Sequence, residues 1–353
     1  MTSRILYHHI CRISTVILIV FYLFICYPVV NKILRCFGCP NCLPERERKK
    51  KMDVKKLIKD AAKRYGMDLC GISGVDRFVE SPKGQHPTEL LPGCKSVIVV
   101  GRRLLDGIVQ ANFRCFEDGR RDLKGLWGTY GYAMLPNFEL TYACYALAQY
   151  IECELGEVGM PLSTGPMTNG IQLSIRHAAV AAGLGEFSWM GLVVSPEFGA
   201  RNRFGVILTT AEIEPDPMYD GPKLCNPEKC GICSKICPTG ALSAYGEDKN
   251  PQTCKVGDKC YTYCNIDRNR CQLATLALNK ELGGKADYVT SENPTDEEIW
   301  NIQQIMPADQ AGLQHVTSHN CGKCQSYCPI GSWNEKFRQR GLTKGAGAAM
   351  EVR

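Results

Sequence analysis

Two cysteine runs near the C-terminus have the residue types and spacing to hold metal. In chain order they read Cys225-x4-Cys230-x2-Cys233-x3-Cys237-Pro238 and Cys321-x2-Cys324-x3-Cys328-Pro329. Thiolates two residues apart can point inward around one compact iron–sulfur cluster. In the bacterial two-cluster pattern the cysteine before the proline binds the other cluster, so the two ligand sets cross over. The runs therefore predict two iron–sulfur clusters and one-electron transfer.

Both runs depart from the usual pattern at their first cysteine. The first run has four residues before its second cysteine, so Cys225 takes the place expected at Pro227, and the second run has Ser318 where its first cysteine should stand. An upstream thiolate must therefore complete the second cluster. The cysteines available for it, starting with the nearest to the first run, are Cys254, Cys260, Cys264 and Cys271.

Structural zinc is the competing interpretation of these runs. A tetrahedral zinc site needs four ligands, but it requires neither a shared three-residue gap nor a cysteine followed by proline. The two runs share both features. Their pattern favours iron–sulfur clusters over zinc.

The composition fits an intracellular globular protein. The chain has 353 residues, 44% of them hydrophobic, which is enough for one large or two modest domains. Its 21 cysteines would suggest disulfides in a small secreted protein, but here many have the spacing of metal ligands. A reducing compartment is therefore expected.

An apolar run near the N-terminus predicts one membrane-spanning helix. It extends from Ile13 to Val30, is 18 residues long, and has more basic residues after it than before it. The positive-inside rule then places the following domain in the cytoplasm, at the cytoplasmic membrane. A cleaved signal peptide is disfavoured because no small-residue cleavage site follows the run. If translation starts at Met52, the protein is cytoplasmic without this anchor.

The segment after the apolar run is basic and contains a short cysteine motif. Residues 31–64 hold 12 Lys and Arg against 4 Asp and Glu, while the whole chain has a net charge of +6. The positive charge is thus typical of a membrane-surface segment and not of a nucleic-acid-binding domain. Cys36, Cys39 and Cys42 could form a third redox centre, carry palmitoyl groups or remain unmodified.

From Met52 onward the pattern alternates between helices and strands. A helix is expected between Asp53, which can cap it, and Gly66, which can end it. Further helices are expected at 138–155 and 171–182, and strands at 69–72, 96–100, 192–195 and 204–210. The chain is therefore predicted to have a mixed α and β fold ahead of the cysteine runs.

Three motifs in order carry a family resemblance. Asn169–Glu186 contains Ala182-Gly-Leu-Gly185, the next segment contains Ser195-Pro-Glu-Phe-Gly199, and the first cysteine run ends in Cys237-Pro-Thr-Gly-Ala-Leu242. Together with the two cysteine runs, they resemble the corrinoid-dependent reductive dehalogenases and, more distantly, the epoxyqueuosine reductases. The resemblance covers roughly Met52 to Trp333.

The resemblance implies an α+β fold with a nitroreductase-like, corrinoid-binding core and a ferredoxin-like domain that holds two [4Fe-4S] clusters. The expected parts are a membrane anchor and basic linker at 1–51, the core at 52–222, the cluster domain at 223–340 and a tail at 341–353. The corrinoid would be bound base-off. None of the six histidines lies in an Asp-x-His-x-x-Gly context, which agrees with base-off binding.

The resemblance also implies ligands for both clusters. The first cluster would be held by Cys225, Cys230, Cys233 and Cys328. The second would be held by Cys237, Cys254, Cys321 and Cys324. Cys260 lies close enough in sequence to be an alternative to Cys254.

Catalytic and corrinoid-binding residues follow from the same resemblance. Asn169 and Arg201 would lie over the cobalt face, and Tyr130 or Tyr132 would donate a proton, with an arginine stabilising the phenolate that remains. Corrinoid contacts are expected from Asn169, Arg176, His177, Gly183, Gly185 and Arg203. The tyrosines could instead be ordinary partly buried aromatic residues, the arginines at 201 and 203 surface charges, and His177 a satisfied core histidine.

The expected function is a reductase that passes electrons through two clusters to cobalt for a reductive cleavage, as in reductive dehalogenases. Ferredoxin, flavodoxin or a membrane redox protein would be the donor, a small molecule the substrate, and no nucleic-acid partner is expected. An epoxyqueuosine reductase is the first alternative, although Ser163-Thr-Gly-Pro166 stands where those enzymes have Asp-Ser-Ala-Pro. The second is a membrane-associated electron carrier without an organic substrate.

Overall fold

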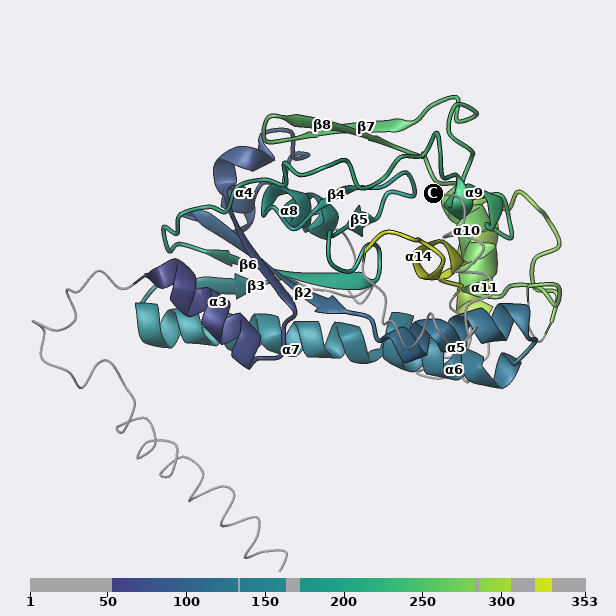
Figure 1. Ribbon diagram of the computed structural model, residues 1–353, viewed down its shortest axis with the longest axis horizontal. Helices are drawn as coiled ribbons and strands as arrows, with labels where there is room; N and C mark the ends of the chain where they lie inside the picture. The colour runs from purple at the N-terminus through teal and green to yellow at the C-terminus, as the bar shows by residue number, and fades with distance from the viewer. Residues whose placement is uncertain (1–52, 133, 163–171, 283–285, 306–320, 332–353) are drawn as a thin grey trace, which may run out of the picture. The chain divides into compact units, whose positions relative to one another are not determined.

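The computed structural model describes residues 53–132, 134–162, 172–282, 286–305 and 321–331 (Figure 1). The predicted membrane helix and the Cys36–Cys42 motif lie outside this part of the chain. Within the described residues, no helix has the length and the apolar composition needed to cross a membrane. The chain divides into two compact units, Met1–Asp53 and Val54–Arg353, and all the structure discussed below belongs to the second.

A four-stranded antiparallel sheet organises this unit. Its strand order is β1-β2-β6-β3. The strands are β1 (Leu69–Gly74), β2 (Ser96–Arg103), β3 (Gly159–Pro161) and β6 (Asn202–Thr209). The central strand β2 is buried over its first six residues, as expected for a β-branched run covered on both faces.

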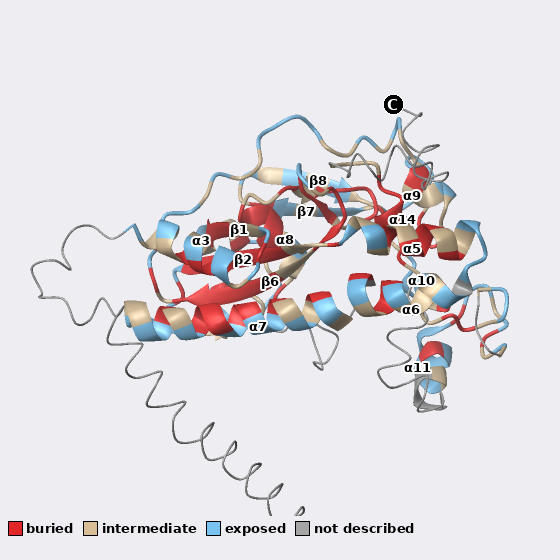
Figure 2. Cartoon of the chain, turned by 60° about the horizontal axis from the view of Figure 1, so that its bottom comes forward, coloured by how far each residue is buried: buried red, intermediate tan, exposed pale blue. Residues whose placement is uncertain are grey.

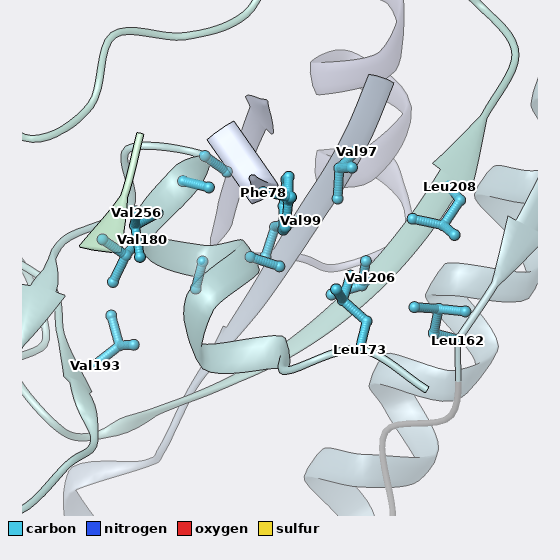
Figure 3. Packing of buried hydrophobic residues seen from close by; sticks show 14 of the residues in the cluster. Phe78, Val97, Val99, Leu162, Leu173, Val180, Val193, Val206, Leu208 and Val256 are labelled. Atoms are coloured by element: carbon cyan, nitrogen blue, oxygen red, sulfur yellow. The ribbon is translucent and has the colours of Figure 1, made fainter. Parts of the chain in front are cut away.

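Helices cover both faces of the sheet because the side chains of β2 and β6 alternate between two apolar cores. Val97 and Val99 of β2 belong to one core, and Ile98 and Val100 to the other. Helix α8 (Ile175–Ala181) packs on the first of these faces, as Figure 3 shows for Val180 and its neighbours. Helices α3 (Val54–Arg64) and α7 (Met134–Tyr150) pack on the second, with α7 turning its buried side to the sheet (Figure 2).

Shorter elements surround the cysteine runs. Two small sheets are formed by β4 (Glu186–Phe187) with β5 (Val193–Val194) and by the hairpin β7 (Gln252–Val256) with β8 (Lys259–Tyr263). The helices near the runs are α5 (Asp106–Glu117), α6 (Lys124–Trp127), α9 (Ile232–Lys235), α10 (Arg268–Thr275), α11 (Asp296–Ile305) and α14 (Lys323–Ser326). The remaining elements are η3 (Val75–Phe78), α4 (Pro87–Leu90), η4 (Arg121–Leu123), η5 (Gly128–Tyr132) and η6 (Ile151–Leu155).

The mixed α and β fold is confirmed, and the differences from expectation lie mostly at element ends. The helix expected at 138–155 begins earlier, at Met134, and continues through η6 to Leu155. The helix expected at 171–182 is confined to α8, which begins after Ser174 because that side chain accepts a hydrogen bond from the His177 backbone N–H.

Candidate metal centres

The first cysteine cavity is a space of 230 Å³ between the first cysteine run and the end of the second. Its apolar walls include Trp189 and Ile330. The cysteines that line it are Cys225, Cys230, Cys233 and Cys328. These are the four residues that the resemblance implies for the first cluster, with Cys328 arriving from the distant run.

A carboxylate and a backbone N–H group hold the start of the first run in place. The carboxylate of Glu186 accepts hydrogen bonds from the backbone N–H groups of Leu224 and Cys225, at 2.7 and 3.0 Å. The backbone N–H of Trp189 donates to the Cys225 sulfur over 3.3 Å. Such N–H···S contacts are among the groups that set the reduction potential of a cluster.

Burial and mutual repulsion make this cavity unfavourable for bare thiolates. Burial, together with a smaller contribution from the neighbouring cysteines, raises the pKa of Cys225 to about 11 and that of Cys233 to about 12. A cationic metal centre would supply the positive charge that stabilises the thiolate forms. The donor set and its surroundings therefore fit a thiolate-bound metal cluster.

The second cysteine cavity has a volume of 340 Å³ and joins the cluster segments to the sheet. The cysteines that line it are Cys237, Cys271, Cys321 and Cys324. Cys237 belongs to the first run but lines the second cavity, whereas the other three cysteines of that run line the first cavity. This is the crossed arrangement of a two-cluster module.

Cys254, the residue expected to complete this set, lies elsewhere. It is part of strand β7, it packs with the core that contains α8, and the charges that affect its pKa are those of Glu80, Arg176 and Cys260. Cys271, which like Cys260 is an exposed residue, lines the cavity in its place. The alternative Cys260 is exposed on β8 and does not line the cavity either.

Helix α10 presents Cys271 to the second cavity. The helix begins after Asp267, whose side chain accepts a hydrogen bond from the Arg270 backbone N–H at 2.9 Å. Ala274 and Thr275, three and four residues after Cys271, also line the cavity, so this side of the helix faces it. The capping aspartate was the available sequence signal for a helix here, although no element was predicted at this position.

The opposite wall of the second cavity comes from the core. Arg176 of α8 lines it and donates a hydrogen bond to the Gly191 carbonyl at 2.6 Å. Arg203 and Phe204 of β6 line it as well. The second cavity is therefore lined both by three cysteines predicted for the second cluster and by two arginines predicted to contact the corrinoid.

Arg201 lies outside the lining of both cavities. It is 2% exposed, and its Nη1 donates hydrogen bonds to the carbonyls of Cys328 and Ile330 at 3.0 and 3.1 Å. The residue is therefore neither a surface charge nor a wall of the second cavity. It connects the start of β6 to the last cysteine of the second run.

His177 and two glycines, which were expected to contact the corrinoid, are engaged in packing. The Nδ1 of His177 lies 2.6 Å from the Ser174 hydroxyl and its ring meets Phe187 edge-on, and burial lowers its pKa to about 4. A Cβ on Gly183 would come within 2.1 Å of the Pro217 carbonyl, and one on Gly185 within 2.0 Å of the Val194 carbonyl. None of the three lines the second cavity within the described residues.

The predicted proton donors are only partly described. Tyr130 lies in η5 and is 46% exposed. Tyr132 ends the same element, and Asn169 lies outside the described residues. The described Tyr130 side chain is thus open to solvent, whereas Arg201 is buried.

Three polar side chains that were not among the predicted site residues also line the second cavity. Asn202 donates to the Gly199 carbonyl at 2.7 Å, and Gln325 donates to the Ala200 carbonyl at 2.8 Å. Asn137 of α7 is a third. Gln325 could have been noticed from the sequence because it directly follows a predicted ligand, Cys324.

The cavities fit the implied clusters better than they fit the implied corrinoid. Each has the four thiols of a [4Fe-4S] site, although no three Cys, His, Asp or Glu side chains within the described ranges are grouped as they would be around a single ion. A volume of 340 Å³ is at the lower end of the roughly 300–1,000 Å³ of pockets for drug-sized ligands. A corrinoid is larger than such a ligand, so these walls enclose only part of one.

Comparisons with known proteins identify two groups of relatives, although no family model matches the chain. The chain is 36% identical over 155 residues to a tetrachloroethene reductive dehalogenase of Dehalobacter restrictus, covering 42% of this chain and 27% of that protein. It is 30% identical over 229 residues to an epoxyqueuosine reductase of Staphylococcus aureus, covering 58% and 57%. The chain thus spans between about a quarter and just over half the length of these relatives.

Solved structures from the same two groups are also similar. A crystal structure of selenomethionine-labelled epoxyqueuosine reductase gives a TM-score of 0.46 at 17% identity, covering 78% of this chain and 65% of that one. A reductive dehalogenase structure, described with a mechanism for B12-dependent dehalogenation, gives a TM-score of 0.46 at 16% identity, covering 77% and 37%.

Proposed function

We propose that this chain, a homologue of the reductive dehalogenases and of the epoxyqueuosine reductases, is an oxidoreductase that passes electrons through two [4Fe-4S] clusters to a corrinoid. Both groups of homologues use these two cofactors. The reaction is a reductive cleavage of a bond in the substrate. Both the cleavage and its substrate belong to the proposal, because the chain covers only part of its relatives.

One observation carries the proposal. The second cysteine cavity is shared by four cysteines and by core residues that include Arg176 and Arg203. An electron held on a cluster at this position would be next to any group bound against the sheet. The arrangement therefore supports transfer from the clusters into the core, as a reductase requires.

The two proposed ligand sets follow the two cavities. The first cluster is held by Cys225, Cys230, Cys233 and Cys328. The second is held by Cys237, Cys271, Cys321 and Cys324. Cys271 thus replaces Cys254, which is in the β7–β8 hairpin.

The residues proposed to hold the corrinoid are Arg176 and Arg203. Their guanidinium groups can donate hydrogen bonds to the amide oxygens at the edge of a corrinoid. When bound, the corrinoid supplies cobalt that can be reduced to a strongly nucleophilic state. The proton donor of the proposal remains Tyr130 or Tyr132, with Asn169 beside the substrate.

Two substrate classes are supported by homologues, and both remain proposals. A small organohalide follows from the dehalogenase relatives and an epoxyqueuosine-modified tRNA from the other group. One similar structure is an epoxyqueuosine reductase with a tRNA-Tyr stem loop. The expectation that nucleic acid is not a partner is therefore withdrawn, and tRNA belongs among the substrates to test.

The first experiment measures iron, sulfide and cobalt in the chain reconstituted anaerobically with cobalamin. Two cubane clusters correspond to about eight irons per chain. We expect Cys271→Ser to lose about half of this iron and the matched variant Cys254→Ser to retain it. The opposite result would return Cys254 to the ligand set. Iron without cobalt would leave the electron carrier as the better account, whereas cobalt binding justifies activity assays with both substrate classes.

A further inference from the structure

Two lysines from distant parts of the chain lie on one aromatic ring beside the second cysteine cavity. The Nζ of Lys124, in α6, is 4.2 Å from the centroid of the Phe116 ring. The Nζ of Lys323, in α14, is 4.5 Å from the same centroid. Both ammonium groups thus gain cation–π stabilisation from a single half-buried phenylalanine of α5.

Lys124 also contacts the backbone of a proposed cluster ligand. Its Nζ donates to the Cys321 carbonyl and to the Asn112 side-chain oxygen, each at 3.4 Å. Asn112 is fully buried and donates in turn to the Cys321 carbonyl at 3.2 Å.

Among the described residues, no carboxylate is paired with either lysine. Positive charge is therefore held where the second cluster would bind.

At the first cysteine cavity one buried cation is offset by a carboxylate, because Arg201 donates to the Cys328 carbonyl at 3.0 Å and Glu186 lies at the start of the first run. The half-buried Glu186 carboxylate accepts a hydrogen bond from the Cys225 backbone N–H at 3.0 Å. Lys229 lines this cavity, but its side chain is exposed, so water and salt screen its charge.

We propose that Lys124 and Lys323 raise the reduction potential of the second cluster above that of the first, so that electrons move from the first cysteine cavity to the second. The proposal rests on the function and ligand sets proposed above. Adding an electron makes a cluster more negative, and nearby positive charge stabilises that state whereas nearby negative charge destabilises it. Lys124, Lys323 and Glu186 are thus positioning residues for electron flow.

The transfer balances as a one-electron exchange. A low-potential one-electron donor protein reduces the cluster of the first cavity. That electron leaves the first site, which is oxidised, and enters the second site, which is reduced. The first site is then ready for another electron, and the second holds the electron beside the core.

The test is a redox titration followed by EPR at pH 7 on the full chain, after its iron content is measured. We expect two potentials. Lys124→Gln and Lys323→Gln should each lower the higher potential, and the double variant should lower it further. Lys124→Arg and Lys323→Arg keep the charge and serve as matched controls, with potentials near those of the unaltered chain. Glu186→Gln keeps a hydrogen-bond acceptor and should raise the lower potential.

Cys271→Ser assigns the potentials because it removes the proposed second cluster. The cluster that remains should titrate at the lower potential. The proposal is overturned if the remaining cluster has the higher potential, or if both Lys→Gln variants leave the two potentials unchanged. A chain with clearly fewer than about eight irons, or a Cys271→Ser variant that keeps all of them, would instead contradict the ligand sets themselves.

Discussion

At the scale of single residues, Arg201 has the clearest structural role. Its buried guanidinium group donates to two carbonyls, those of Cys328 and Ile330, and so holds the last cysteine of the second run against β6. A charged donor of this kind is worth more than a neutral one, and carbonyls left without it remain buried. Arg201 would therefore support the proposed first cluster by holding Cys328 in place.

Replacing Arg201 should weaken the first cluster site. We expect Arg201→Met to lower the free energy of unfolding by roughly 3 kcal/mol, since two hydrogen bonds from a charged donor are lost. It should also speed the loss of about half the iron on incubation with a chelator. Arg201→Lys, which keeps a charged donor, should lose less. Unchanged iron retention in Arg201→Met would show that the contact does not support the cluster.

His177 gives the chain a specific pH dependence. Burial, and next the charge of Arg176, lower its folded-state pKa to about 4, below the value of about 6.5 in an unfolded chain. Between these values the unfolded chain binds a proton that the folded chain does not, so stability falls as the pH falls from 6.5 to 4. The stabilising contribution is fully present only above pH 6.5.

The measurement compares His177→Gln with the unaltered chain. The free energy of unfolding, measured by urea titration at intervals between pH 7 and pH 4.5, should fall less steeply for the variant. The two chains should differ by on the order of 1–2 kcal/mol over this range. Cluster loss at low pH affects both chains and cancels in the comparison. Parallel curves would mean that His177 is not buried in its neutral form.

At the scale of elements, α10 decides which cysteine reaches the second cavity. Asp267 starts the helix, and the helix then directs Cys271 into the cavity together with Ala274 and Thr275. Cys254, in strand β7, is kept out of the cavity because it packs in the core that contains α8 and Phe187. Local structure, rather than distance along the chain, therefore selects the ligand.

Removing the cap of α10 should affect stability and the second cluster together. Asp267→Ala loses the hydrogen bond to the Arg270 backbone N–H and should cost about 1 kcal/mol of unfolding free energy. Asp267→Asn preserves the acceptor and is the control. We expect iron to be lost faster from Asp267→Ala in chelator, and equal rates for the two variants would argue against a role of this helix in ligation.

At the scale of the whole molecule, the second cysteine run is integrated with the core. Gln325 bonds to Ala200, Asn112 bonds to Ser326 at 2.8 Å, and Tyr327 donates to Glu117 at 2.5 Å. These contacts join the run to β6 and α5, which belong to the same compact unit, Val54–Arg353. The cluster segments thus depend on the core for their position.

Iron removal should consequently destabilise the entire unit. Because metal ligation contributes to folding free energy only where the ligands are part of the folded unit, the apo chain should melt at a lower temperature in one transition. Differential scanning calorimetry before and after chelation measures this, and restoring iron and sulfide is the control. A core transition that stays at the same temperature would indicate a separately folding cluster domain.

The sequence by itself determined the local features of this protein. A β-branched run predicted the strand at 96–100, and cysteine spacing indicated two groups of thiols, because both patterns depend on residues close together in the chain. The crossing of Cys237 and Cys328 between groups followed from a known motif.

Only the tertiary structure decided which distant residues meet. It brought Cys271 rather than Cys254 to the second cavity, turned Arg201 toward the Cys328 carbonyl, and placed Lys124 beside Cys321. Coordination, hydrogen bonds and Coulomb interactions act through space and depend on how helices and hairpins pack. Sequence spacing carries no information about such contacts once the residues lie in separate elements.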